Sequence, residues 1–82
     1  MAIILRSDKT REDIVLLSIA QILTVIGGEK EEIEVPNCFN IIIADKQAEV
    51  KDKHINVEAS RIAQKTVFGD VILCIKLNGQ FQ

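Results

Sequence analysis

The amino-acid sequence predicts a single small α+β domain covering residues 1–82. Apolar runs of strand length and two segments with helical spacing of apolar residues predict the class, and 82 residues fit one hydrophobic core. Fourteen isoleucines and only three aromatic residues indicate that branched aliphatic side chains fill this core. The net charge of −2 lacks the basic excess that is typical of a general polyanion binder.

The first elements along the chain are expected to be a strand and a helix. The aliphatic run at 2–6 predicts a buried strand. Thr10, with Asp13 three residues later, resembles a capping box and predicts a helix over residues 10–26. Gly27 and Gly28 would end this helix, because glycine readily adopts the left-handed conformation of a C-cap.

A hairpin is expected next. Residues 32–35 alternate polar and apolar, which predicts a strand with one wet face. The apolar run at 39–44 predicts a strand that is covered on both faces. Residues 48–51 could add a short extra strand, and the charged residues 51–54 predict an exposed loop.

The last elements complete the predicted fold. Asn56 is a suitable N-cap for a helix over 56–67, and 71–77 is the strongest strand pattern in the chain. Asn78-Gly79 is a turn signal, so a short returning strand would follow. The resulting βαββαβ order resembles the ferredoxin-like arrangement, which implies an antiparallel sheet with two helices on one face.

Two groups of apolar residues exceed the needs of one core. In the first predicted helix, Ile14, Leu17 and Val25 fall opposite the core-facing stripe, where a surface helix would be polar. In the sheet, Ile42, Ile72 and Cys74 would point to the face left open by the helices. Other parts of the same chain could cover either group. Together, the two groups favour a partner interface, in a homodimer or an assembly subunit.

Residues suited to catalysis or metal binding are sparse. His54 is the only histidine and has no neighbouring nucleophile, so an enzymatic pairing with Cys38 through space is the last-ranked hypothesis. Cys38, His54 and Cys74 are not spaced like zinc ligands, and both cysteines have the apolar neighbours of free buried thiols. We therefore expect a non-enzymatic protein that needs no metal or cofactor.

The acidic charge is concentrated in one short segment. Residues 29–34 carry a net charge of −3, and the four carboxylates of this acidic edge are Glu29, Glu31, Glu32 and Glu34. Charge on an edge strand prevents association between sheets, and this interpretation is preferred. The alternative is a phage-type inhibitor that docks its acidic edge on a basic host protein.

The basic residues suggest two further sites. Lys51, Lys53, Arg61 and Lys65 could contact nucleic-acid phosphates. However, residues 45–65, which also include Lys46, have a net charge near +1, and no aromatic residues are placed to stack on bases. The segment 7–11 has hydroxyls and cations at a predicted helix start, where an anion could bind. Neighbouring acidic residues oppose that, so helix capping is the preferred interpretation there.

No membrane anchor is expected. The longest apolar stretch, 14–26, falls short of the roughly 20 residues of a bilayer span, and the apolar run before Arg6 is too short for a signal peptide. We therefore expect a cytoplasmic protein. The leading functional hypothesis is a small non-enzymatic protein-interaction or regulatory module. Nucleic-acid binding is its alternative.

Overall fold

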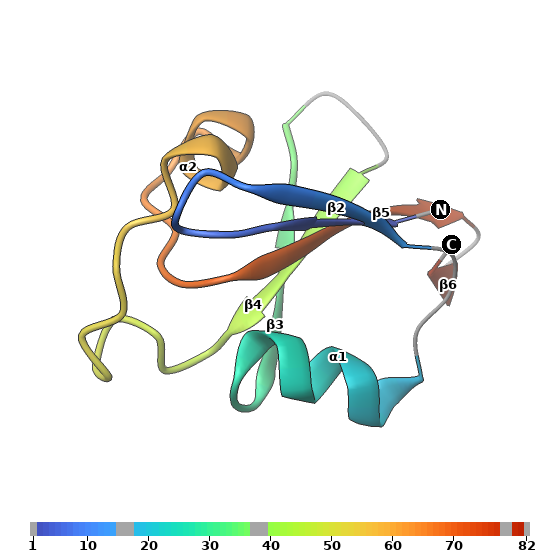
Figure 1. Cartoon of the computed structure of the whole chain (residues 1–82). Helices are drawn as coiled ribbons and strands as arrows, with labels where there is room; N and C mark the ends of the chain where they lie inside the picture. Colours follow the sequence, from blue (N-terminus) through green and yellow to red (C-terminus); the bar gives the residue numbers. More distant parts are fainter. Residues whose placement is uncertain (1, 15–17, 37–39, 78–79, 82) are drawn as a thin grey trace.

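The computed structural model describes residues 2–14, 18–36, 40–77 and 80–81 and confirms the α+β class (Figure 1). It consists of a five-stranded antiparallel sheet, two helices and a short additional strand. In chain order the elements are β1 (Ala2–Leu5), β2 (Arg11–Ile14), α1 (Ile19–Ile26), β3 (Lys30–Glu34), β4 (Asn40–Asp45), α2 (Val57–Ala63), β5 (Val71–Leu77) and β6 (Gln80–Phe81).

The sheet is centred on β5, the strand with the strongest pattern in the sequence. The strand order is β2-β1-β5-β4-β3, and every neighbouring pair is antiparallel. β1 and β2 form one hairpin, and β3 and β4 form the other. The short returning strand expected after Asn78-Gly79 is β6, which pairs with Lys76 and Leu77.

The two helices lie on opposite faces of the sheet, as Figure 1 shows, and not on one face as the sequence predicted. The reason is visible in β4, whose four consecutive apolar side chains are all buried. Ile41 and Ile43 pack in the core on the α1 side, while Ile42 and Ala44 pack in the core on the α2 side. A strand that is apolar on both faces needs cover on both faces, as the sequence indicated for residues 39–44.

The ferredoxin-like order is not confirmed. Strand β2 replaces the first part of the helix predicted over 10–26, and the helix begins only at Ile19. Asp8 accepts hydrogen bonds from the Thr10 amide and hydroxyl, and the Lys9 amide donates to the Arg6 carbonyl. These bonds close a tight turn after β1, so the chain returns beside β1 as an edge strand.

The true start of α1 has a clear local cause. The Gln21 amide donates to the Ser18 hydroxyl at 3.2 Å, and the Ser18 amide donates to the Gln21 side chain at 2.9 Å. This is a complete capping box, so the Ser-x-x-Gln pattern was the better signal in the sequence. The predicted end is confirmed, since Gly27 forms the left-handed C-cap.

The second half of the chain departs less from expectation. Asn56 is the N-cap of α2 as predicted, but the helix ends at Ala63 and not near residue 67. Gln64 adopts a left-handed conformation there and terminates the helix. Residues 48–51 form turns, so the extra strand expected in this segment is absent from it.

Candidate functional site

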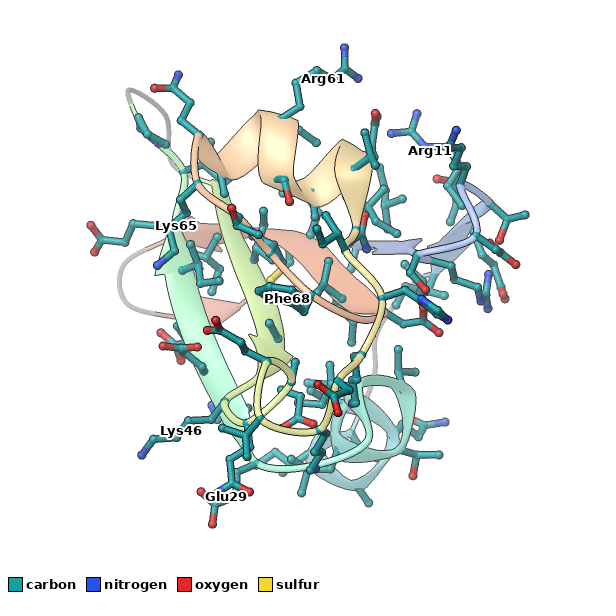
Figure 2. The ribbon with its side chains drawn as sticks, turned by 90° about the vertical axis from the view of Figure 1, so that its left-hand side faces the viewer. Arg11, Glu29, Lys46, Arg61, Lys65 and Phe68 are labelled. Carbon is teal, nitrogen blue, oxygen red and sulfur yellow. The ribbon has the colours of Figure 1, made fainter. Side chains whose placement is uncertain are left out.

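A cavity of about 460 Å³ lies between the turn after β1 and the helix α2. It is lined by Leu5, Lys9, Thr10, Arg11, Val57, Glu58 and Arg61, and we call it the basic pocket. Three of these residues are cationic and one is anionic. In Figure 2, Arg11 and Arg61 lie near the same end of the molecule, while Lys46 lies toward the other.

Glu58 joins the two arginines of the basic pocket. Its Oε1 accepts from Arg11 at 3.1 Å, and its Oε2 accepts from Arg61, three residues along α2. Arg11 reaches Glu58 because it pairs with Leu5 in the sheet and therefore points to the α2 side. The β1–β2 turn and the α2 helix thus meet through one shared carboxylate.

Lys9 reaches the basic pocket from a backbone conformation that disfavours it. Its φ is +75°, in the left-handed region where glycine and asparagine are preferred. Lys9 follows the two central residues of the turn, and the Arg6 amide donates to the Thr10 carbonyl across it. Glycine is the usual residue at this position of such a turn, so the turn itself does not call for lysine.

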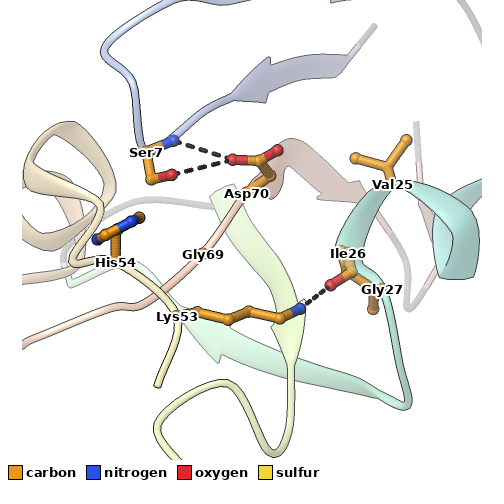
Figure 3. A pocket seen from close by; sticks show the side chains of 8 residues that line it. All are labelled: Ser7, Val25, Ile26, Gly27, Lys53, His54, Gly69 and Asp70. Carbon is orange, nitrogen blue, oxygen red and sulfur yellow. Dashed lines mark hydrogen bonds between the residues drawn. The ribbon is translucent and has the colours of Figure 1, made fainter. Parts of the chain in front are cut away.

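A second cavity, of about 260 Å³, contains the single histidine (Figure 3). Ser7, Lys53, His54 and Asp70 line it together with the end of α1. The Ser7 hydroxyl lies 3.4 Å from the Asp70 carboxylate, which also accepts from the Ser7 amide at 3.0 Å. The Ser7 hydroxyl is therefore bonded to a carboxylate, and among the described residues no hydrogen bond joins it to His54, as the Ser–His pair of an activated nucleophile would require.

The four basic residues predicted to contact nucleic acid lie on different parts of the surface. Lys51 and Lys53 both bind Asp45, with Nζ–Oδ2 distances of 2.9 and 2.8 Å. Lys51 also donates to the Gly27 carbonyl, and Lys53 to the Ile26 carbonyl, so both secure the end of α1. Arg61 lies on α2 beside Glu58, and Lys65 is exposed beyond the end of that helix.

The environment of Asp45 explains why this charge is retained inside the fold. Burial raises the pKa of Asp45, but hydrogen bonds from Lys53 and Lys51 lower it by more. The Gln47 amide, at 3.0 Å, adds a third hydrogen bond to the carboxylate. The net result is a pKa well below the ordinary value of 3.8, so Asp45 is ionised throughout the neutral range.

The residues expected at a partner interface lie mainly in the interior. Ile42, Ile72 and Cys74 are buried in the two cores, and α1 covers the sheet face expected to be open. Ile14 and Val25 are half-buried against the core on the α1 side. Leu17, like Cys38 of the enzymatic hypothesis, lies outside the described residues.

The exposed apolar surface of α1 is formed instead by Ile19 and Leu23. Ile19 is 67% exposed and Leu23 is 36% exposed, and the two are one helical turn apart. Ile22 and Val25 of the same helix pack against the core, and Ile26 is fully buried. The segment Ser18–Ile26 contains no charged residue, so this exposed surface is uncharged.

The acidic edge lies on β3 and the turn before it. Glu31, Glu32 and Glu34 belong to this edge strand, while Glu29 precedes it. All four glutamates are exposed, and Glu32 binds Lys30 with a 3.5 Å ion pair. Their position fits protection of a sheet edge. Docking of this edge on a basic host protein stays a prediction.

Comparison with known proteins identifies no relative. No protein-family model, curated protein or solved structure matches the chain. Within the described ranges, no group of three or more His, Cys, Asp or Glu side chains is arranged to hold a metal ion. Neither helix in the described part of the chain is long and apolar enough to cross a bilayer.

Proposed function

We propose that the protein is a small non-enzymatic interaction module that forms a homodimer through the exposed surface of α1. The observation that carries this proposal is the pair Ile19 and Leu23, aligned one turn apart on the helix. Apolar side chains that protrude together from a helix are stabilised when a second surface covers them and removes them from water.

A second copy of the same chain is a suitable occupant because α1 is uncharged. In a two-fold symmetric dimer each residue meets the same patch on its partner, so a charged patch would face its own sign. The segment Ser18–Ile26 avoids this repulsion, and two antiparallel copies of α1 could place Ile19 of one against Leu23 of the other.

The dimer should be weak. A helix of eight residues is about 12 Å long, so it cannot by itself supply the roughly 1,000 Å² expected of a stable interface. We therefore expect monomers and dimers to interconvert with concentration. Such reversible association suits a regulatory or assembly role.

The test is sedimentation equilibrium of the intact chain over a wide concentration range. The wild type should dimerise as concentration rises, and Ile19→Glu or Leu23→Glu should remain monomeric. Gln21→Glu is the matched control, because it adds the same charge on the opposite side of α1 and preserves the capping box. Circular dichroism checks that each variant is folded.

Two outcomes contradict the proposal. A wild type that stays monomeric at millimolar concentration excludes the dimer. A dimer that persists in Ile19→Glu shows that another surface forms the interface.

A further inference from the structure

We propose that the basic pocket binds a small ligand that carries a phosphate monoester group on an apolar body. The argument uses the charge of the pocket, the arrangement of its arginines, the backbone of Lys9 and the apolar part of its lining. The proposal is independent of dimer formation, since the pocket lies between the turn after β1 and α2, away from the α1 surface.

The charge of the pocket matches a phosphate dianion. Lys9, Arg11 and Arg61 contribute three positive charges to the lining, and Glu58 contributes one negative charge. The lining is therefore +2, whereas a phosphate monoester carries about −1.5 to −2 at neutral pH. A carboxylate ligand would leave part of this positive charge uncompensated.

The two arginines are held at the pocket before any ligand arrives. Glu58 binds Arg11 through one oxygen and Arg61 through the other, which places both guanidinium groups around a single carboxylate. Each guanidinium has five N–H donors, so a bond to Glu58 leaves donors for phosphate oxygens. Such advance positioning reduces the side-chain entropy lost on binding.

The presence of a lysine at position 9 is not explained by the structure of the turn alone. A lysine with φ of +75° is strained, and glycine at this position would relieve the strain. No hydrogen bond or ion pair of the Lys9 side chain is found within the described part of the chain. A cation at the rim of the pocket is the benefit that we assign to this residue.

The remaining lining favours a ligand that also has an apolar body. Leu5 is buried at the pocket, and the Val57 side chain beside it is largely exposed. A ligand that covers Val57 would remove apolar surface from water. The volume of about 460 Å³ lies within the roughly 300–1,000 Å³ of small-molecule sites.

A small ligand fits better than a nucleic acid because the other cations do not continue the pocket. Binding along a nucleic-acid backbone uses a row of cations that follows successive phosphates. Lys51 and Lys53 are instead paired with Asp45 at the end of α1. In Figure 2, Lys65 and Lys46 also lie apart from Arg11.

The experiment is a two-dimensional NMR titration of the isotope-labelled protein with phenyl phosphate, inorganic phosphate and phenol. Phenyl phosphate should shift the amide signals of Lys9, Thr10 and Arg11 and bind more tightly than inorganic phosphate. Phenol should bind too weakly to measure. Arg11→Gln and Lys9→Gly should each weaken phenyl phosphate binding about tenfold, the loss expected for one charged hydrogen bond.

Lys9→Gly is the most informative variant because it should stabilise the fold while weakening the binding. Lys65→Gln is the matched control, since it removes an exposed charge outside the pocket and should change the affinity less than twofold.

Absence of shifts at millimolar phenyl phosphate would overturn the proposal. So would equal affinity for inorganic phosphate, or an equal loss in Lys65→Gln. Stronger binding to a single-stranded oligonucleotide, reduced equally by Lys46→Gln and Lys9→Gly, would replace it with a nucleic-acid surface.

Discussion

Lys53 donates a hydrogen bond of 2.8 Å to the Asp45 carboxylate, whose side chain is only 1% exposed. Lys51 binds the same oxygen at 2.9 Å. Because both lysines also donate to carbonyls at the end of α1, a single buried carboxylate links β4, the following loop and the helix. The position of α1 over the sheet therefore depends on a charge that is hidden from solvent.

Replacement of Asp45 should destabilise the fold. Asp45→Asn removes the carboxylate but leaves two ammonium groups beside it, and loss of one partner of a buried ion pair is expensive. Since the lysines are partly exposed and can turn to water, we expect a loss of about 2–4 kcal/mol in the free energy of unfolding. Urea denaturation at pH 7 measures it. Asp52→Asn, an exposed neighbour, should change stability by less than about 0.5 kcal/mol.

The same site predicts how stability depends on pH. The pKa of Asp45 is lowered on folding from its ordinary value of 3.8, so its contribution is present above that value and is lost as the pH falls below it. The stability difference between wild type and Asp45→Asn should thus shrink from about pH 5 toward pH 2. A difference that stays constant over this range would show that folding does not lower the pKa of Asp45.

Asn56 should be as sensitive to substitution as Asp45. Its side chain is fully buried, donates to the Leu5 and Gly69 carbonyls at 2.8 and 2.9 Å, and caps α2 by accepting from the Ala59 amide. Asn56→Ala should cost about 2–4 kcal/mol, because two buried carbonyls and one amide lose their partner.

Two comparisons, made by thermal or urea unfolding, separate the contribution of the Asn56 cap from that of its bonds to the Leu5 and Gly69 carbonyls. Asn56→Asp keeps an acceptor for Ala59 but turns a carboxylate toward two carbonyl oxygens, so it should be at least as destabilising as Asn56→Ala. Ser18→Ala removes only the cap of the exposed helix α1 and should cost about 1 kcal/mol. Equal losses in Asn56→Ala and Ser18→Ala would mean that the bonds to Leu5 and Gly69 contribute nothing.

Gln64 offers a way to stabilise the protein. It terminates α2 with φ of +57°, a conformation that has a steric penalty for every residue with a β-carbon. Gln64→Gly should raise the free energy of unfolding by about 0.5–1 kcal/mol, seen as an increased melting temperature. Gln64→Ala retains the β-carbon and should give no such gain. If both variants melted alike, the backbone at Gln64 would not be strained.

The elements that were predicted well are those with an unambiguous local signal. The 71–77 strand, the Asn56 cap and the Gly27 helix end depend on nearby residues alone. The prediction of a helix over 10–26 was wrong because Thr10 with Asp13 resembled a helix cap. In the structure Asp8 instead closes a turn, and Ser18 forms the actual cap. The helix placement failed because the local pattern does not show which face each helix covers.

The candidate site was predicted only in fragments. The sequence predicted a possible anion site at 7–11 and a possible phosphate contact at Arg61. It did not indicate that the two lie next to each other. Arg11 and Glu58 are 47 positions apart, and only the β1–β2 hairpin, which was not predicted, brings them together. Lys51 and Lys53 were candidates for phosphate contacts because the net charge of a segment cannot show that Asp45 is buried between them.

Cys74 provides a direct test of whether α1 covers its face of the sheet. The sequence placed this thiol on an open face, but in the structure it is buried with Ile4 and Ile72. Burial raises the pKa of the Cys74 thiol, and the nearby Glu32 carboxylate raises it further, so the reactive thiolate is disfavoured.

In a Cys38→Ser background, a thiol reagent should react with Cys74 at least about 100-fold more slowly than in urea, because reaction requires the core to open. Leu23→Glu measured in parallel should leave this protection in place, since Leu23 is partly exposed on α1 and the variant should affect only self-association. Reaction in native buffer at a rate within about tenfold of the unfolded rate would mean that α1 does not cover this face.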